Sequence, residues 1–211
     1  MLLYFVDNDI IIELASYNLF WEMIASLQAS QKDFRVLPTA SSYIDGSSKL
    51  RRKYKQESLQ FGKRIADSIQ VIDHNLIDQS ELLSLNLEGI DSGEALLVAA
   101  TKGEDNAYLL TCDKRFLKTL SKSNLNIIKE RLSKKIICLE QLLINLINNN
   151  DDFDKIRRRI IASDLQNQNI FETFKNGKLT TKEQALQILE EFTKELRQQT
   201  GDLLVDSLPV K

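Results

Sequence analysis

Two aspartates stand just after stretches of apolar residues, in positions from which a carboxylate can do chemistry. Asp7 follows the run LLYFV directly, and Asp113 follows AYLLT after a single cysteine. Short continuous apolar runs predict strands that are buried on both faces of a parallel sheet. Ligands of open parallel sheets bind beyond the carboxyl ends of the strands, near the point where strand order reverses. We therefore expect both carboxylates at one ligand site.

A third acid, Glu94, falls in the first turn of the predicted helix that precedes the second of these strands. Clustered carboxylates repel one another, so they usually hold a hard cation, and oxygen ligands suit Mg²⁺ or Mn²⁺. Such a metal can activate water and stabilise the leaving oxygen of a phosphodiester. Each acid taken alone is also explained by helix capping or by the helix dipole. No glycine-rich phosphate loop is present, which disfavours an NTPase or a dinucleotide enzyme.

The elements that must position these acids alternate between strands and helices. Strands are predicted at 2–6, 34–37, 68–72, 107–110 and 134–139, and helices at 9–28, 40–67, 81–87, 91–101, 114–120 and 140–147. Asp9 is the expected N-cap of the first helix. The alternation implies βαβ crossovers, so we expect a three-layer α/β/α domain around a central parallel sheet of about five strands.

The pattern changes after the polar stretch NNNDD at 148–152. Beyond it only helices are predicted, one over 155–175 and one that begins at Thr180, with Glu183 completing a capping box. We therefore expect two parts, an α/β domain over 1–148 and a helical C-terminal extension over 149–211.

Composition is that of an ordinary soluble protein, with 43% hydrophobic and 27% charged residues. The chain begins without the features of a secretory signal, and no apolar run approaches the ~18 residues that a membrane span needs. A cytoplasmic protein without a membrane partner is the expectation. His74 is the one histidine of the sequence, and we expect it in a surface loop rather than at a zinc site.

Positive charge is unevenly distributed, although the net charge of −2 does not by itself indicate a nucleic-acid partner. Residues 49–64 carry seven lysines or arginines against one acid. On a helix, side chains such as Arg51, Arg52 and Lys55 could follow a phosphate backbone, or they could simply form a solvated face. Lys114 and Arg115, beside Asp113, are better placed to contact a scissile phosphate.

Three segments resemble, in order and in spacing, the motifs of the PIN-domain nuclease family. DNDIIIEL at 7–14 resembles its opening motif and GEALLVAA at 93–100 its central acidic helix. LLTCDKRFL at 109–117 resembles its last acidic motif, a strand that ends in Thr-x-Asp. The resemblance covers about residues 1–145. It implies a PIN-like sandwich and a nuclease dependent on Mg²⁺ or Mn²⁺, most often acting on RNA.

The resemblance also assigns roles. It makes Asp7, Glu94 and Asp113 metal ligands, and Thr111 a residue that orients a ligand or water. Asp9 would add to the cluster or cap the helix. Family members usually have a further glutamate shortly after the second strand, where this chain reads VLPTASSYIDGSS. Asp45 is the nearby carboxylate that could replace it.

The leading expectation is a ribonuclease of this type, and family analogy adds a role as the toxin of a toxin–antitoxin pair. An antitoxin or other protein partner and a homodimer formed through the first helix belong to the same analogy. The unfilled acidic position supports an alternative, a catalytically weak module that binds nucleic acid or a protein through its helical extension. A structure-selective DNA nuclease is a third reading.

Overall fold

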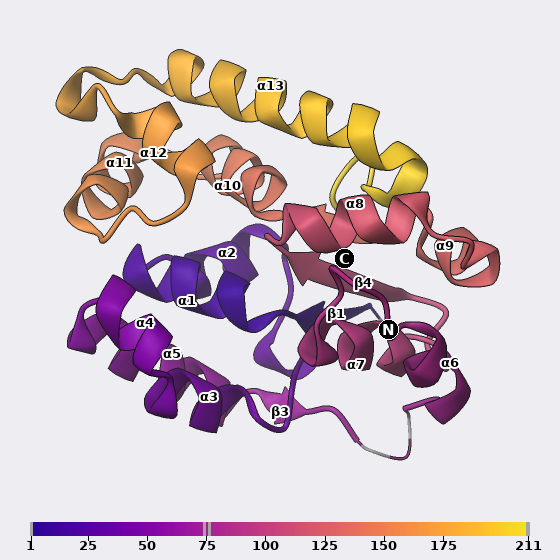
Figure 1. The fold of residues 1–211 in the computed structure, drawn as a ribbon. Helices are drawn as coiled ribbons and strands as arrows, with labels where there is room; N and C mark the ends of the chain where they lie inside the picture. The colour runs from indigo at the N-terminus through magenta and orange to yellow at the C-terminus, as the bar shows by residue number, and fades with distance from the viewer. Residues whose placement is uncertain (1, 74, 76, 210–211) are drawn as a thin grey trace.

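A five-stranded parallel sheet forms the centre of the computed structural model, which describes residues 2–73, 75 and 77–209 (Figure 1). Its strands are β1 Leu3–Val6, β2 Phe34–Val36, β3 Gln70–Val71, β4 Ala107–Thr111 and β5 Ile136–Cys138. They lie in the order β3-β2-β1-β4-β5. The expected α/β class with a central sheet of five parallel strands is confirmed. The predicted surface position of His74 lies outside the described residues.

Helices cover the sheet on both sides and complete the three layers (Figure 1). Before β4 they are α1 Asn8–Ser16, α2 Phe20–Ser26, α3 Ala40–Gly46, α4 Ser48–Lys53, α5 Gln56–Ser68, α6 Gln79–Ser84 and α7 Ser92–Ala100. After β4 they are α8 Lys114–Lys122, α9 Asn126–Leu132, α10 Leu139–Asn148, α11 Phe153–Ala162, α12 Gln168–Phe174 and α13 Lys182–Thr200.

Strand order reverses between β1 and β4. The chain runs from β1 outward through β2 to β3 and then returns to β4 on the other side of β1. Val6 is paired with Leu110, and the backbone N–H of Asp7 donates to the Leu110 carbonyl at 3.0 Å. The ends of these two strands therefore meet at the switch point, where open parallel sheets bind their ligands.

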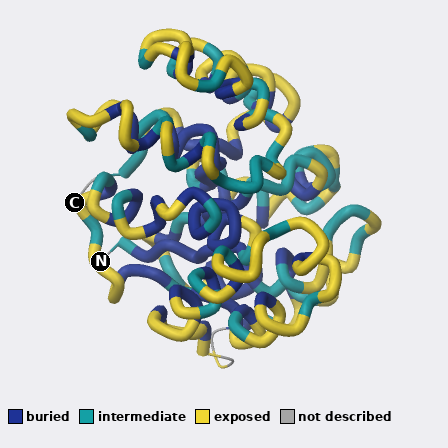
Figure 2. Tube along the Cα trace, turned by 90° about the vertical axis from the view of Figure 1, so that its left-hand side faces the viewer, coloured by how far each residue is buried: buried dark blue, intermediate teal, exposed yellow. Residues whose placement is uncertain are grey.

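The first strand lies deep in the core. All four of its residues are buried, and the Tyr4 ring stacks on Phe34 of the neighbouring strand with 4.9 Å between centroids. Burial of side chains of this size stabilises the fold by about 1.5–3 kcal/mol each. Figure 2 shows the buried chain gathered in the middle, with exposed segments around it. The sheet edge that carries Asp7 is thus rigidly held.

The predicted single helix over 9–28 is wrong, because the structure contains α1 and α2 there. The break includes Asn18, whose φ of 55° is incompatible with a continuous right-handed helix. Apolar periodicity runs across the break because both helices bury apolar faces in the same core. The N-cap of α1 is Asp7 rather than Asp9.

The predicted helix over 40–67 is also divided, into α3, α4 and α5. Ser47 and Tyr54 have extended backbones between these helices, and the Ser47 hydroxyl caps α4 by accepting from the Leu50 N–H at 3.3 Å. Polar composition hid these breaks, since few apolar positions mark the faces of such short helices. For the same reason α9, which buries only Ile128 and Leu132, was not predicted.

The C-terminal helices pack on the α/β part. The predicted helix over 155–175 is two helices, α11 and α12, and the capping box of α13 is formed by Thr181 and Gln184, one residue later than predicted. α13 packs along α10 and α8 (Figure 1). The segment that follows it continues beside β5, where the Val205 N–H donates to the Ile136 carbonyl at 2.9 Å. Among the described helices, none combines the length and the apolarity needed to cross a membrane.

Candidate active site

Five acids line one cleft of about 300 Å³ at the carboxyl ends of β1 and β4. They are Asp7, Asp9, Asp91, Glu94 and Asp113. Each of the three acids predicted as principal ligands is among them, although 106 positions separate the first from the last. The sheet topology brings them together, because β1 and β4 are neighbours while the chain between them visits the far edge of the sheet.

Thr111 connects the two strand-end aspartates. Its hydroxyl donates to Oδ2 of Asp7 at 3.1 Å. The Oγ1 of Thr111 in turn accepts from the backbone N–H of Asp113 at 3.1 Å. Thr111 is 1% exposed and Asp7 9%. A buried hydrogen bond of this kind fixes the carboxylate in one orientation. The threonine therefore occupies the position predicted for it, against a candidate ligand.

Asp113 is the N-cap of α8. Its Oδ1 accepts from the Phe116 N–H at 2.9 Å, which satisfies one of the unpaired donors of the first turn. Its Oδ2 lies 3.9 Å from an Nη of Arg115, another residue of the cleft. Capping thus uses one oxygen of this carboxylate, and the other oxygen faces the guanidinium of Arg115.

Glu94 forms a reciprocal capping box with Asp91 at the start of α7. Its Oε2 accepts from the Asp91 N–H at 2.7 Å, and Asp91 Oδ1 accepts from the Glu94 N–H at 2.8 Å. Glu94 is 4% exposed. Glu94 therefore both caps α7 and lines the cleft, and a substitution is needed to separate these two roles.

Burial makes three of these acids hard to ionise, among them Asp9, whose pKa is raised by burial with the charge of Asp113 adding to the effect. Burial raises the pKa of Asp7 to about 7, with the charge of Asp9 adding to the effect and the Thr111 hydrogen bond opposing it. Burial likewise raises the pKa of Glu94 to about 9, against the hydrogen bond from Asp91 and reinforced by the charge of Asp113. Strongly raised carboxyl pKa values in a cleft are typical of functional sites, since the fold gains nothing from them.

The donor chemistry of the cleft fits Mg²⁺ or Mn²⁺, which prefer carboxylate and amide oxygens. Asn8, also in the cleft, has a buried Oδ1 for which the described part of the chain supplies no hydrogen-bond partner. However, residues 2–73, 75 and 77–209 contain no group of three acids, histidines or cysteines gathered closely enough to hold one ion. A cation at this site would therefore have to draw the carboxylates inward.

Asp45, the candidate substitute for the missing acid, does not join the cluster. It is exposed on α3 and is not among the residues that line the cleft. Its backbone carbonyl accepts from an Nη of Arg51 at 2.6 Å. The side chains that the second strand and α3 do bring to the cleft are Thr39 and Tyr43. The position after the second strand therefore contributes hydroxyl groups instead of a carboxylate.

The predicted phosphate-binding residues separate into two groups. Arg115 lines the cleft. Lys114 is turned away, with its Nζ 3.0 Å from Glu140 and over the Phe192 ring, and Lys55 pairs with Asp164 at 3.5 Å. Arg51 and Arg52 are exposed on α4 outside the cleft.

Two lysines of the same basic run, which helical spacing groups loosely with Arg51, were not named as phosphate contacts. Lys49 and Lys53 are exposed on α4 and line the cleft, where the charge of each opposes the rise that burial causes in the pKa of Asp9. Their spacing of four residues places them on one face of a helix, and this signal could have identified them. Tyr43, 39% exposed, lies in the same wall.

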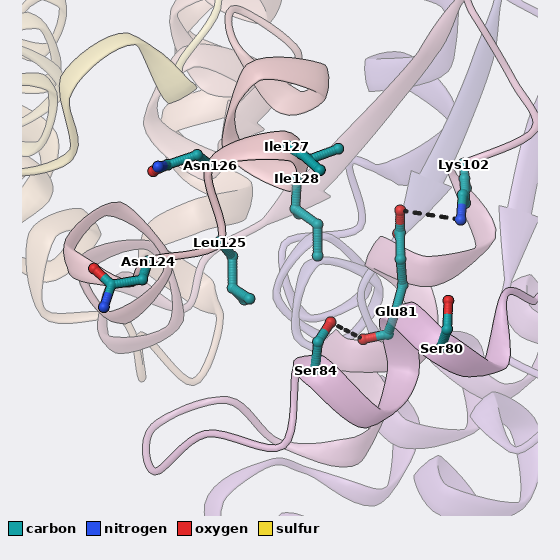
Figure 3. Close-up of a pocket in the computed structure, with 9 residues that line it drawn as sticks. All are labelled: Ser80, Glu81, Ser84, Lys102, Asn124, Leu125, Asn126, Ile127 and Ile128. Carbon is teal, nitrogen blue, oxygen red and sulfur yellow. Dashed lines mark hydrogen bonds and ion pairs between the residues drawn. The ribbon is translucent and has the colours of Figure 1, made fainter.

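A larger hollow of about 550 Å³ lies elsewhere, between α6, the turn that follows α7 and the start of α9 (Figure 3). Its charged lining residues are Glu81 and Lys102. Both are paired, since Lys102 Nζ lies 3.8 Å from Glu81 and 2.6 Å from Asp78. The hollow thus offers a ligand little free charge, and the acids of the candidate site are not part of it.

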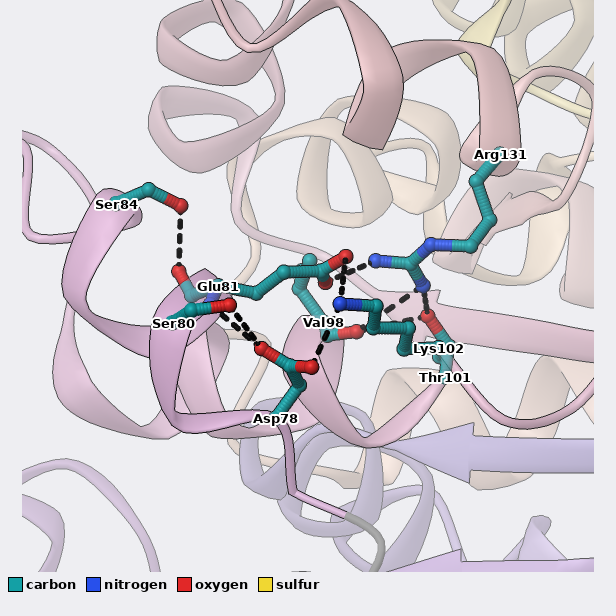
Figure 4. Close-up of polar contacts among 8 residues, drawn as sticks. All are labelled: Asp78, Ser80, Glu81, Ser84, Val98, Thr101, Lys102 and Arg131. Carbon is teal, nitrogen blue, oxygen red and sulfur yellow. Dashed lines mark hydrogen bonds and ion pairs between the residues drawn. The ribbon is translucent and has the colours of Figure 1, made fainter.

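The ion pairs beside this hollow hold three helices together (Figure 4). Arg131 of α9 pairs with Glu81 of α6, and it also donates to the hydroxyl of Thr101 and to the Val98 carbonyl at the end of α7. The side chains of Arg131 and Glu81 are 19% and 10% exposed. Since α7 carries Glu94 in its first turn, this network also positions the site.

Arg131→Ala is expected to lower the free energy of unfolding by about 3 kcal/mol, because it leaves Glu81 buried with a weaker partner. Denaturant titration followed by circular dichroism measures this loss. Lys134→Ala is the control, since its ion pair with Asp206 is exposed on both sides and should matter little. Equal small effects of both substitutions would show that the network does not hold α9.

Comparison with known proteins gives no family assignment. The chain matches no protein-family model, and no curated protein and no solved structure is significantly similar to it.

Proposed function

We propose that this chain is a metal-dependent nuclease of PIN-like type that hydrolyses phosphodiester bonds in RNA, with the acidic cleft as its active site. One observation supports the proposal above the others. Five acids share the cleft at the switch point of the sheet with three basic residues, Lys49, Lys53 and Arg115. Acids alone would suit any hard cation, but acids and basic residues in one cleft suit a phosphate backbone bridged to a metal.

In this proposal Asp7, Glu94 and Asp113 hold Mg²⁺ or Mn²⁺, with Asp9 as a further acid. When bound, such a metal supplies an activated water and stabilises the charge of the leaving oxygen. Thr111 keeps the Asp7 carboxylate in one orientation through its hydrogen bond. Arg115, beside Asp113, is placed to bind the scissile phosphate.

Cleavage of labelled single-stranded RNA and DNA tests the function. Purified protein is incubated with each substrate in Mg²⁺, in Mn²⁺ and in EDTA. The proposal requires RNA cleavage that EDTA abolishes. Cleavage that persists in EDTA would contradict it, and preferred cleavage of DNA would instead support a DNA nuclease.

A second candidate function is a module that binds nucleic acid without cutting it. It is favoured by the absence, among the described residues, of three potential ligands gathered around one point, and by the position of Asp45 outside the cleft. Tight binding of RNA in EDTA, together with no cleavage in either metal, would support this candidate over the nuclease.

Replacing both cleft lysines, Lys49→Ala with Lys53→Ala, is expected to weaken RNA binding about tenfold and to reduce the salt dependence of log Kd by about 1.5. For each phosphate that a lysine no longer neutralises, one fewer counterion is released from the RNA on binding. Fluorescence anisotropy in EDTA over a range of salt measures both quantities. The double variant Lys175→Ala with Lys178→Ala removes the same charge from exposed positions near α12. Equal losses in the two variants would mean that only total charge matters.

A further inference from the structure

The basic wall of the cleft is built on a helix too short to hold its own orientation. α4 has six residues and buries only Leu50, and a single isolated turn of helix is unstable in water. Lys49 and Lys53, the two basic residues of α4 that line the cleft, are both exposed. Their placement must therefore depend on how the chain is anchored where α4 ends.

An inner anchor holds the end of α4 to α1. The hydroxyl of Tyr54, directly after α4, donates to Oε1 of Glu13 at 2.8 Å. Tyr17 donates to the other oxygen of the same carboxylate. Glu13 is 5% exposed, so this buried acid has a donor on each oxygen. Tyr54 also lines the cleft, which connects the anchor directly to the site.

An outer anchor comes from the helical extension, more than a hundred residues further along the chain. The backbone N–H of Lys55 donates to Oδ2 of Asp164 at 2.8 Å. The Nζ of the same lysine lies 3.5 Å from Oδ1 of Asp164 and donates to the Ala162 carbonyl at 3.3 Å. The Asp164 side chain is 14% exposed. It lies in the connection between α11 and α12.

We propose that Asp164 is a positioning residue through which the helical extension fixes the lysine wall of the cleft for the phosphate backbone. Asp164 does not touch the substrate. It holds the junction between α4 and α5 from outside while Glu13 holds it from inside, so Lys49 and Lys53 keep one spacing from the acids. The inference rests on the proposed function, since it assigns the extension a part in binding nucleic acid at that site.

Charge alone gives the opposite expectation, and this makes the proposal testable. Removing an acid makes the net charge less negative, which should tighten binding to a polyanion. If Asp164 positions the wall, Asp164→Ala should instead weaken binding of a fluorescein-labelled single-stranded RNA about tenfold, measured by anisotropy in EDTA. Asp154→Ala is the matched control, since it removes the same charge from an exposed site on α11 and should leave binding unchanged or slightly tighter.

A second pair of variants removes the hydrogen bond without changing Asp164. Lys55 has φ −60° and follows a residue in extended conformation, so the backbone at position 55 accommodates proline, which has no N–H to donate. Lys55→Pro and Lys55→Ala both lose the lysine charge and its contacts with Asp164 and Ala162, but only Lys55→Pro also loses the backbone hydrogen bond to Asp164. We expect Lys55→Pro to bind RNA several-fold more weakly than Lys55→Ala.

The outcomes separate this proposal from the function on which it rests. Binding by Asp164→Ala that equals or exceeds that of the parent, or equal binding by the two Lys55 variants, would overturn the positioning role and leave the nuclease untouched. If the parent protein binds RNA, and Asp164→Ala weakens that binding, but the parent does not cleave RNA, then the nuclease proposal alone would be overturned. A parent protein that neither binds nor cuts RNA would overturn both.

Discussion

Asp7→Asn is expected to cleave RNA about 10³-fold more slowly than the parent and yet to unfold at a higher temperature in the absence of divalent cations. The loss of activity follows from removing a charged ligand on the strand that forms the centre of the cleft, and it has the magnitude typical of groups that stabilise transition-state charge. The gain in stability follows from the raised pKa of Asp7.

The sign of the stability change follows from proton linkage. The pKa of Asp7 is raised from 3.8 to about 7, chiefly by burial. A carboxyl group whose pKa is raised in the folded state contributes its full stability at a pH below the pKa of the unfolded state. This contribution is lost as pH rises from about 4 to 7. At pH 8 the charged, buried carboxylate therefore costs the metal-free protein up to about 4 kcal/mol. Asparagine carries no charge and still accepts the hydrogen bond from Thr111.

Thermal unfolding at pH 5 and pH 8, with EDTA and with Mg²⁺, measures this effect. We expect Asp7→Asn to unfold about 5 °C higher than the parent at pH 8 in EDTA, to show little difference at pH 5, and to gain less from Mg²⁺. Asp105→Asn, at an exposed position outside the cleft, is the control and should change nothing. A variant less stable than the parent at pH 8 would mean that Asp7 serves the fold, and equal cleavage would exclude it from the active site.

The inner strands of the sheet could be predicted from the sequence because β1 and β4 are mainly buried on both faces, whereas both residues of the edge strand β3 are exposed. Runs such as Leu2–Val6 and Ala107–Leu110 have no polar residue, and only a strand inside a three-layer domain accommodates them. The helices between them were harder to delimit. The kink at Asn18 and the extended residues Ser47 and Tyr54 are imposed by packing and local hydrogen bonds, which leave no clear mark on apolar periodicity.

The acids of the cleft could likewise be predicted, whereas its lysines could not. Asp7 and Asp113 were predicted at the site because they follow strands, and Glu94 was predicted from helix geometry with the help of a family resemblance. The lysine wall depends on how α4 is anchored, and those anchors come from Glu13 and Asp164. Contacts this distant in sequence have no local pattern, so helical spacing could group Lys49 with Lys53 but could not show that their face of the helix reaches the cleft.

Glu94→Gln separates the two roles that Glu94 has in the structure. Glutamine at this position of a capping box still accepts from the backbone N–H of the N-cap residue, so the bond to Asp91 and the start of α7 are retained. The charge is lost, and with it a proposed metal ligand. We therefore expect cleavage to fall about 10²-fold while the metal-free protein unfolds at the same or a higher temperature. Parent-like cleavage would reduce Glu94 to a helix cap and contradict a three-acid metal site.

The dependence of cleavage on pH supplies an independent check on the same residue. Burial raises the pKa of Glu94 to about 9 and that of Asp7 to about 7, and a cation binds only the deprotonated forms. In the parent at low Mg²⁺, cleavage should rise about a hundredfold per pH unit below pH 7, where both acids hold protons. It should rise about tenfold per unit between pH 7 and pH 9, where only Glu94 still has a proton to lose. Raising Mg²⁺ should move the whole profile to lower pH, because the cation competes with the protons. The increase above pH 8 should disappear in Glu94→Gln, and a parent profile that Mg²⁺ does not move would mean that these carboxylates do not bind the metal.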